Sequence, residues 1–212
     1  MRLRKKPWMA KALAEYLGKE IIAEDIDKNK GKWQELVGGK SLALEIGCGK
    51  GKFINGMAQL YPEMGFVGIE TQLDICYYPA RQVRENKLTN VKIIGGDAAY
   101  LTQWFLPGEV KMIYLNFSDP WPKARHSKRR LTYRDFLLQY KTILAPGGHL
   151  RFKTDNKDLF DFSVEEFKAF GLQIIALSYD LHNSEYENAI QTEYEEKFSA
   201  KGNKINFCEV VF

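Results

Sequence analysis

An acidic residue and three glycines stand together at a turn between an apolar run and an amphipathic segment. The run Leu42–Ile46 contains Glu45 and leads directly into the glycine-rich stretch 47–51 (GCGKG). Glycines at such a turn let the backbone bend sharply and approach a bound ligand without a Cβ clash. The spacing is G-x-G-x-G, and Lys52 stands where a dinucleotide fingerprint would place its third glycine. The candidate cofactor-binding glycines are Gly47, Gly49 and Gly51.

The charge of Glu45 bears on which ligand this turn suits. A carboxylate beside a pyrophosphate adds like charge, which counts against a nicotinamide dinucleotide. The same carboxylate suits a ligand with a cationic end, such as the ammonium and sulfonium groups of S-adenosylmethionine. Two alternatives stay open at this point, a glycine turn with only a structural role and a nicotinamide-dependent oxidoreductase.

Further acids follow the next apolar runs. Glu70 can accept hydrogen bonds from both ribose hydroxyls of an adenosine, a feature that S-adenosylmethionine shares with NAD. Asp97 can accept from an adenine amino group or serve as the N-cap of the following helix. Asp119 and Asp155 come after two later runs. Parallel strands place their carboxyl ends at one edge of a sheet, so we expect all these acids to face one ligand site.

The segment after Asp119 combines an aromatic ring with positive charge. In 119–123 (DPWPK), two prolines fix the backbone around Trp121. A carboxylate and an indole offer a nucleobase an acceptor for its N–H groups and a face for stacking. The alternative is an Asp-Pro turn with Trp121 in the core. A basic run, 125–130 (RHSKRR), follows directly and would anchor phosphates beside a base-sized pocket.

Positive charge is segregated along the chain. The net charge is +4, from 31 basic and 27 acidic residues. Residues 1–11 and 123–134 contain eleven basic residues and no acid, whereas the rest of the chain has 20 basic against 27 acidic residues. This distribution predicts a local positive field of the kind that attracts a polyanion, with a solvated charged face as the alternative.

The stretch 192–195 (TEYE) has the spacing of a helix capping box. We expect a helix to begin after Thr192, with the Glu side chains pointing outward, where they could also meet a ligand. The three histidines, His126, His149 and His182, show no metal-ligand spacing, and we assign no metal site.

Composition excludes several classes of protein. With 45% hydrophobic and 13% aromatic residues, global disorder is excluded. No apolar run approaches the roughly 18 residues of a membrane span, and Lys11 and Glu15 interrupt any signal-peptide core. Three cysteines without a C-x-x-C pair argue against a disulfide framework and a cysteine zinc site. We expect a soluble, cytoplasmic protein.

Short apolar runs alternate with helical patterns from about residue 40 onward. This alternation predicts an α/β fold whose mostly parallel sheet is covered on both faces. Helical patterns span Leu73–Asn86 and Thr132–Leu144, the second ending at a turn, Pro146-Gly147-Gly148. We expect the last two runs to pair as antiparallel edge strands, and we divide the chain into a basic extension, 1–39, and a main domain, 40–212. The predicted strands are Leu42–Ile46, Phe66–Ile69, Val91–Ile94, Met112–Phe117, His149–Phe152, Leu172–Leu177 and Ile205–Phe212.

Together these motifs resemble the bacterial tRNA (guanine-N7) methyltransferases from Lys32 to Phe212. The resemblance rests on EIGCGKGKF, GIE, YLNFSDPWPKARHSKRRLTY, FKTDN, DLHNS and TEYEEKF. Ala124 departs from the family pattern, in which we expect another basic residue. The resemblance implies a class I, Rossmann-like methyltransferase fold with an antiparallel C-terminal strand. It also implies transfer of a methyl group from S-adenosylmethionine to N7 of a guanine in the variable loop of tRNA, at position 46, without a metal.

The resemblance also implies roles for individual residues. Cofactor contacts are expected from Glu45, Glu70, Asp97 and Asp119, and substrate contacts from Lys123, Asp155 and the segment Thr192, Glu193, Tyr194 and Glu195. RNA contacts are expected from Arg125, His126, Ser127, Lys128, Arg129 and Arg130.

Guanine N7 is a neutral nucleophile with no proton to remove, so the reaction needs positioning and electrostatics more than a general base. We assign Asp119 as the catalytic residue and expect Asp119 and Asp155 to accept hydrogen bonds from the guanine N–H groups. A non-catalytic RNA-binding module and a methyltransferase for a protein or small molecule remain alternatives. The sequence is compatible with a monomer or a homodimer.

Overall fold

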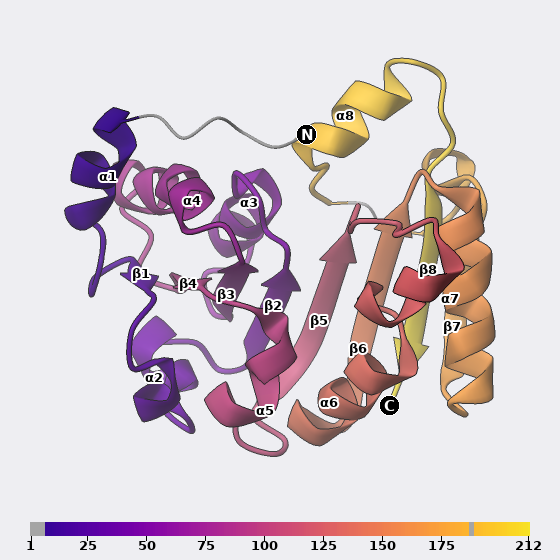
Figure 1. Cartoon of the computed structure of the whole chain (residues 1–212), viewed down its shortest axis with the longest axis horizontal. Coiled ribbons are helices and arrows are strands. Elements are labelled where there is room, and N and C mark those ends of the chain that lie inside the picture. Colours follow the sequence, from indigo (N-terminus) through magenta and orange to yellow (C-terminus); the bar gives the residue numbers. More distant parts are fainter. Residues whose placement is uncertain (1–6, 187–188) are drawn as a thin grey trace.

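The computed structural model describes residues 7–186 and 189–212 and is built on one eight-stranded sheet (Figure 1). The strand order across the sheet is β1-β4-β3-β2-β5-β6-β8-β7. Strands β1 to β6 pair in parallel, whereas β8 runs antiparallel to both β6 and β7. The strands are β1 (Ile21–Ile22), β2 (Leu42–Ile46), β3 (Gly65–Glu70), β4 (Val91–Gly95), β5 (Val110–Asn116), β6 (Leu144–Thr154), β7 (Gln173–Ser178) and β8 (Asn206–Val211).

The strand order reverses on either side of β2, and this reversal creates the site. The chain steps outward from β2 to β3 and β4 and then returns to place β5 on the other side of β2. Ligands of open α/β sheets bind at such a switch point, outside the carboxyl ends of the strands. The turns after β2 and β5 therefore lie next to each other.

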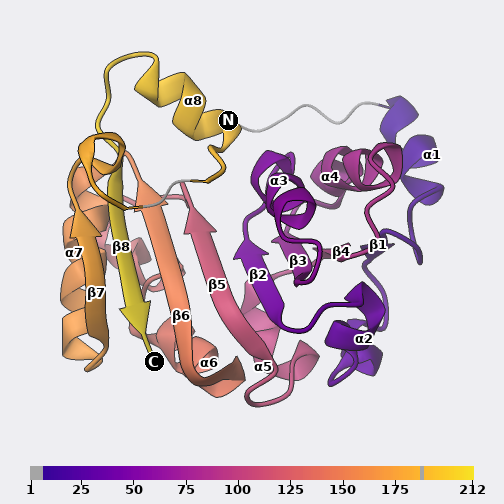
Figure 2. The same cartoon turned by 180° about the vertical axis from the view of Figure 1, so that it is seen from behind.

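Helices cover the two faces of the sheet to different extents. On one face, α5, α6 and α7 pack with α2 over the main hydrophobic core. On the other, α1, α3 and α4 cover the half of the sheet that contains β1 to β4 (Figure 2). The helices are α1 (Pro7–Ala14), α2 (Trp33–Val37), α3 (Lys52–Leu60), α4 (Leu73–Glu85), α5 (Leu101–Trp104), α6 (Arg134–Ile143), α7 (Lys157–Ala169) and α8 (Glu193–Ser199), with short 3-10 turns η1 (Ile26–Asn29), η2 (Ala98–Tyr100), η3 (Ala124–Arg129) and η4 (Leu181–Asn183).

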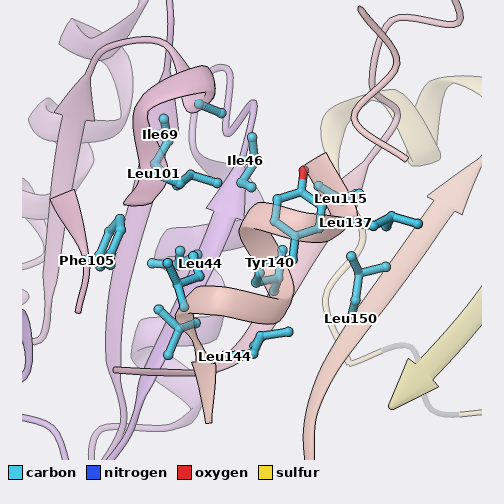
Figure 3. Close-up of a cluster of buried hydrophobic side chains, with 14 of the residues drawn as sticks. Leu44, Ile46, Ile69, Leu101, Phe105, Leu115, Leu137, Tyr140, Leu144 and Leu150 are labelled. Carbon is cyan, nitrogen blue, oxygen red and sulfur yellow. The ribbon is translucent and has the colours of Figure 1, made fainter. Parts of the chain in front are cut away.

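The main core explains why α6 forms where it does. Its buried residues Leu137, Tyr140 and Ile143 recur every third position and so share one face of the helix. Figure 3 shows Leu137 and Tyr140 beside Leu115 and Leu150. The hydroxyl of Tyr140 donates a hydrogen bond to the Leu131 carbonyl at 2.9 Å, which satisfies its polar end in the core.

The C-terminal part of the chain covers the carboxyl edge of the parallel strands. In both views α8 lies above the ends of β5 and β6, away from the strands' starting edge (Figures 1 and 2). No helix within the described residues is long and apolar enough to cross a membrane.

The fold confirms the α/β prediction, including each of the seven expected strands, with three differences. The helix expected over Thr132–Leu144 spans Arg134–Ile143 and stops before Pro146 as predicted, but the tight turn predicted at Pro146-Gly147-Gly148 is wrong. Those residues lie in β6, where the register with β5 shifts between Val110 and Met112. The last two strands pair antiparallel with each other as predicted, but only β7 is at the edge of the sheet, because β8 also pairs with β6. Finally, the two-residue strand β1 was not predicted.

The N-terminal segment is integrated with the sheet. Strand β1 pairs in parallel with β4, through Ile21 and Ile93 among others. Trp33 of α2 is fully buried, and its indole N–H donates to the Trp104 carbonyl at 2.8 Å. The boundary between an extension and a main domain at residues 39 and 40 stays a prediction.

Candidate active site at the carboxyl edge of the sheet

The glycine turn after β2 combines open space with close packing. Gly47, Gly49 and Gly51 have φ angles of 80°, 54° and 85°, in the left-handed region that favours glycine. A Cβ on Gly47 would have no atom within 4 Å, whereas one on Gly51 would lie 2.3 Å from Cβ of Pro79 in α4. Gly47 therefore borders a space where a ligand can approach the backbone, and Gly51 allows α4 to pack closely.

Glu70 holds this turn in place. One carboxylate oxygen accepts from the Gly49 N–H at 3.2 Å, and the other from the Gln72 N–H at 2.9 Å. Cys48, inside the turn, is buried, and a Cβ on Gly68 would lie 2.9 Å from its Sγ. Burial raises the pKa of the Cys48 thiol well above its usual value, so it is a packed, protonated side chain.

Glu45 is a buried carboxylate with one oxygen left open. Asn116 of β5 donates its side-chain N–H to Oε1 at 2.9 Å. Oε2 is buried and has no hydrogen-bond partner among the described residues. Burial raises the pKa of Glu45 to about 8, although the Asn116 hydrogen bond, the charge of Lys153 and the backbone N–H of Ile54 oppose that rise. The carboxyl group is therefore mostly protonated at neutral pH unless a cation is placed beside Oε2.

The open oxygen of Glu45 and the open side of Gly47 fit a ligand that has a cationic group. A buried acceptor without a partner is costly, and an ammonium group could supply the missing donor and charge. Glu70 stands at the end of the adjacent strand β3, where hydroxyl groups of the same ligand would meet a further acceptor.

Asp97 takes the capping role that we considered for it. Its carboxylate accepts from the Ala99 N–H at 2.9 Å and caps η2. The side chain is exposed, so its second oxygen is available to a ligand. This outcome is compatible with both roles predicted from the sequence.

The loop after β5 presents Asp119 between two backbone positions of unusual geometry. Phe117 and Trp121 have φ angles of 52° and 42°, which non-glycine residues rarely adopt. Such strain persists only where surrounding contacts impose it, and it is concentrated at functional sites. Asp119 is exposed and makes no hydrogen bond or ion pair with another described residue. Its carboxylate is thus available to a ligand.

The basic run forms most of η3, and two of its arginines contact the preceding loop. The Arg130 guanidinium donates to the carbonyls of Pro120 and Trp121 at 3.1 and 3.2 Å. Arg129 lies over the Trp121 ring, with 4.8 Å between its Cζ and the ring centroid. Trp121 is half-buried at the surface, so the core position considered for it is wrong. Three cations in or beside the run are exposed, namely Lys123, Arg125 and Lys128, and of these Arg125 donates from Nε to Nε2 of His126 at 3.3 Å.

Helix α8 begins as the capping box predicts. Thr192 accepts from the Glu195 backbone N–H at 3.0 Å. Tyr194 is 56% exposed and lies nearly parallel to Phe117, with 6.5 Å between ring centroids. Glu193 is near enough to Glu45 to raise its pKa further. The helix thus lies over both the Glu45 carboxylate and the Asp119 loop.

The expectation that the glutamates of this segment point outward is wrong for Glu195. Its side chain is fully buried. One carboxylate oxygen accepts from Lys153 Nζ at 2.7 Å, and the other lies 2.9 Å from Nε2 of His182. Burial lowers the pKa of Lys153, and the charge of Glu195 opposes this change.

The structure therefore brings most predicted residues to one edge, together with three that the sequence reasoning missed. Glu45, Glu70, Asp97, Asp119 and Asp155 all lie at the carboxyl ends of neighbouring parallel strands, and Thr192 to Tyr194 lie above them. The missed residues are Asn116, Lys153 and His182. A lysine between Phe152 and Thr154 was visible, but an alternating strand pattern does not distinguish a buried cation from an exposed one.

Comparisons with known proteins match this chain to methyltransferases. A family model described as a putative methyltransferase matches residues 39–208. The tRNA (guanine-N(7)-)-methyltransferase of Geobacillus sp. (strain WCH70) is 46% identical over 213 residues, covering 100% of this chain and 96% of that protein. The enzyme of the same name from Bacillus subtilis (strain 168) is 46% identical over 211 residues, covering 99% and 98%. A solved SAM dependent methyltransferase from Aquifex aeolicus has a TM-score of 0.57 at 12% identity, over 96% of this chain and 97% of that chain, and shows the fold alone.

The pKa of Glu45 predicts a pH dependence of stability. An acid whose folded pKa is raised holds a proton that the unfolded chain releases, so its contribution to stability is lost as pH rises from about 4.5 to about 8. Glu45→Gln removes this loss. We expect the Tm of the ligand-free variant to exceed that of wild type by a difference that grows from near zero at pH 5 to several degrees at pH 8.5.

Differential scanning calorimetry across this pH range measures the difference. Glu196→Gln is the matched control, because Glu196 is exposed on α8. A Tm difference for Glu45→Gln that is constant with pH would show that Glu45 is ionised in the ligand-free protein.

Proposed function

The chain belongs to the bacterial tRNA (guanine-N7-)-methyltransferase family, and from this we propose that it methylates N7 of guanine 46 in the variable loop of tRNA, with S-adenosylmethionine as the methyl donor. The observation that carries the proposal is the unpartnered Glu45 oxygen beside the open glycine turn, next to the exposed Asp119 loop. A cation-binding pocket and a base-binding loop are the two halves that such a reaction requires.

The residues present fit the cofactor. Glu45 would pair with its ammonium group, the glycine turn would lie along its amino-acid part, and Glu70 would accept from the ribose hydroxyls. Asp97 would accept from the adenine amino group through the oxygen that does not cap η2. When bound, S-adenosylmethionine supplies a methyl group on a positively charged sulfur.

The chain's own part in the chemistry is to orient a guanine. Guanine N7 carries a lone pair and no proton, so the site needs no general base. Asp119 and Asp155 lie at the ends of adjacent strands β5 and β6, and neither is paired with another described residue. Their carboxylates would accept from the guanine N–H groups and hold N7 toward the methyl donor. A fixed negative charge also stabilises the positive charge that methylation places on the ring.

The surface around this loop supports a nucleic-acid substrate. Lys123, Arg125 and Lys128 are exposed within twelve residues that contain no acid. Phe117 and Tyr194 provide aromatic faces beside Asp119, and stacking on aromatic rings is a common way to hold an unpaired base. Ala124 lowers the positive charge beside this run by one relative to the family pattern. The exposed cations and the aromatic rings named above are unaffected.

A direct test is transfer of labelled methyl from S-adenosylmethionine to unmodified tRNA, followed by chemical cleavage at N7-methylguanine. We expect one cleavage site, at guanine 46. A tRNA transcript with adenosine at position 46 is the control and should accept no label. Labelling elsewhere in the tRNA would contradict the assigned position, and no transfer with both ligands bound would contradict the proposed activity.

Substitution of Asp119 should lower the methylation rate far more than it weakens tRNA binding. Asp119→Asn keeps the size of the side chain but removes the charge, and we expect the single-turnover methylation rate to fall by about 100-fold or more. The tRNA dissociation constant should change less than about threefold. The control is Glu63→Gln, because Glu63 is an exposed acid that precedes β3 and so lies at the opposite edge of the sheet. A variant that methylates at the wild-type rate would remove Asp119 from the mechanism.

The exposed cations of the basic run should control the salt dependence of tRNA binding. Arg125→Gln with Lys128→Gln should weaken binding and lower the slope of log K against log salt by about one unit per lost phosphate contact. Lys40→Gln with Lys141→Gln is the charge-matched control, since both residues precede parallel strands and lie at the opposite edge. An unchanged slope in the first variant would place the RNA elsewhere.

A further inference from the structure

A buried ion pair connects the last part of the chain to the sheet. Lys153 of β6 is 5% exposed and Glu195 of α8 is fully buried, with 2.7 Å between Nζ and Oε2. Removing two charges from water costs free energy that a pair recovers only with good geometry and further hydrogen bonds. An apolar pair would have served stability as well, so the presence of charge here calls for another explanation.

The further bonds are present, and they join three separate segments. His182 of η4 lies 2.9 Å from Oε1 of Glu195. Lys153 Nζ also lies 3.4 Å from the Ile190 carbonyl and 5.2 Å from the ring centroid of Phe53 in α3. One lysine and one glutamate thus bring together the strand, the turn at 181–183 and the start of α8.

The same lysine also positions the loop that carries Asp119. The Phe117 N–H donates to the Lys153 carbonyl at 2.9 Å. Because Phe117 lies against Tyr194, the backbone of Lys153 holds one ring while its side chain, through Glu195, holds the helix that carries the other. Contacts of a single residue, Lys153, therefore hold both rings in place.

Lys153 also acts on the cofactor side of the site. Its charge lowers the pKa of Glu45, and Glu45 in turn raises that of Lys153, so the two groups are electrostatic neighbours. The lysine thus interacts both with the carboxylate proposed to face the ammonium group and with the one bonded to it on α8.

We propose that Lys153, Glu195 and His182 are positioning residues that fix α8 and its Tyr194 over the Asp119 loop. This inference rests on the proposed function, and it changes the role expected for Glu195. A carboxylate that is fully buried and bonded to two side chains does not contact the substrate. It acts through the helix, and the part of the segment that faces the substrate is Thr192 to Tyr194.

The test compares two neighbouring glutamates of α8 in the full-length protein. Glu195→Gln keeps the shape of the side chain and removes the charge, and Glu196→Gln makes the same change at an exposed position, where the acid pairs with Lys52. We expect the single-turnover rate at saturating tRNA to fall about 30-fold or more for Glu195→Gln and less than twofold for Glu196→Gln. The dissociation constant of S-adenosylhomocysteine should change less than about threefold in both. A wild-type rate in Glu195→Gln would overturn the proposal.

A double variant separates positioning from stability. Glu195→Gln leaves Lys153 buried without its carboxylate and should lower Tm, whereas Lys153→Met with Glu195→Gln removes both charges and should restore most of it. We expect the methylation rate of the double variant to stay low, because the bond from Lys153 of β6 to α8 is then lost. Recovery of the rate together with Tm would show that the pair serves stability alone and would overturn the proposal.

Limited proteolysis makes the inference independent of the proposed activity. Trypsin can cleave after Lys197, which is exposed on α8. Release of the helix in Glu195→Gln should speed this cleavage about tenfold relative to Glu196→Gln, while equal cleavage rates would contradict the fixing of α8. If the wild-type protein transfers no methyl group to tRNA, the proposed function fails, and the cleavage comparison still decides whether the network holds the helix.

Discussion

The site depends on buried ionisable groups at the carboxyl edge of the sheet, where carboxyl groups outnumber the buried lysine that interacts with them. Glu45 and Glu195 are buried carboxylates, and Lys153 is a buried cation that interacts with both. Lys153 is bonded to Glu195 at 2.7 Å, whereas one oxygen of Glu45 has no partner among the described residues. Glu195 thus has a cation bonded to it, whereas the open oxygen of Glu45 has none in the part of the chain that the structure describes. Burial raises the pKa of Glu45, and the bound proton then removes the charge that has no partner.

The topology explains how these groups meet. Glu45, Asn116 and Lys153 lie on the neighbouring strands β2, β5 and β6, and the register pairs of those strands bring their ends to the same level. Because the strand order reverses beside β2, the glycine turn and the Asp119 loop are adjacent without any long connection. The return of the chain through β7 and β8 then places α8 above both. Strain at Phe117 and Trp121 is compensated by the Lys153 carbonyl and the Arg130 guanidinium, which fix the loop from two sides.

Much of this arrangement could be predicted from the sequence, for physical reasons that differ between elements. The apolar runs revealed the strands because buried parallel strands have few polar residues, as in β2 and β3. The acids at strand ends were predicted to meet because parallel strands share one carboxyl edge. Strand β1 was missed because two residues give no periodic signal. The turn at Pro146-Gly147-Gly148 was misplaced, since a register shift within a strand uses the same residues as a helix stop.

The buried network was beyond prediction because it depends on tertiary contacts. The sequence of 192–195 indicated a helix cap, and Thr192 confirms it, but the same spacing does not tell which glutamate turns inward. Lys153 and His182 are 29 residues apart and meet only through Glu195. Similarly, nothing in the glycine turn shows that Glu45 pairs with an asparagine 71 residues later. Local patterns thus predicted where the site lies, and the fold determines how its charges are balanced.

The central claim is that Glu45 is protonated in the ligand-free protein and becomes ionised when a cationic group binds beside it. Calorimetric titration with S-adenosylhomocysteine at pH 7, in buffers of different ionisation enthalpy, counts the protons released on binding. The account predicts release of close to one proton per ligand bound, because the pKa of Glu45 is about 8 before binding. A binding enthalpy that is the same in every buffer would mean that no proton is released and would contradict the account.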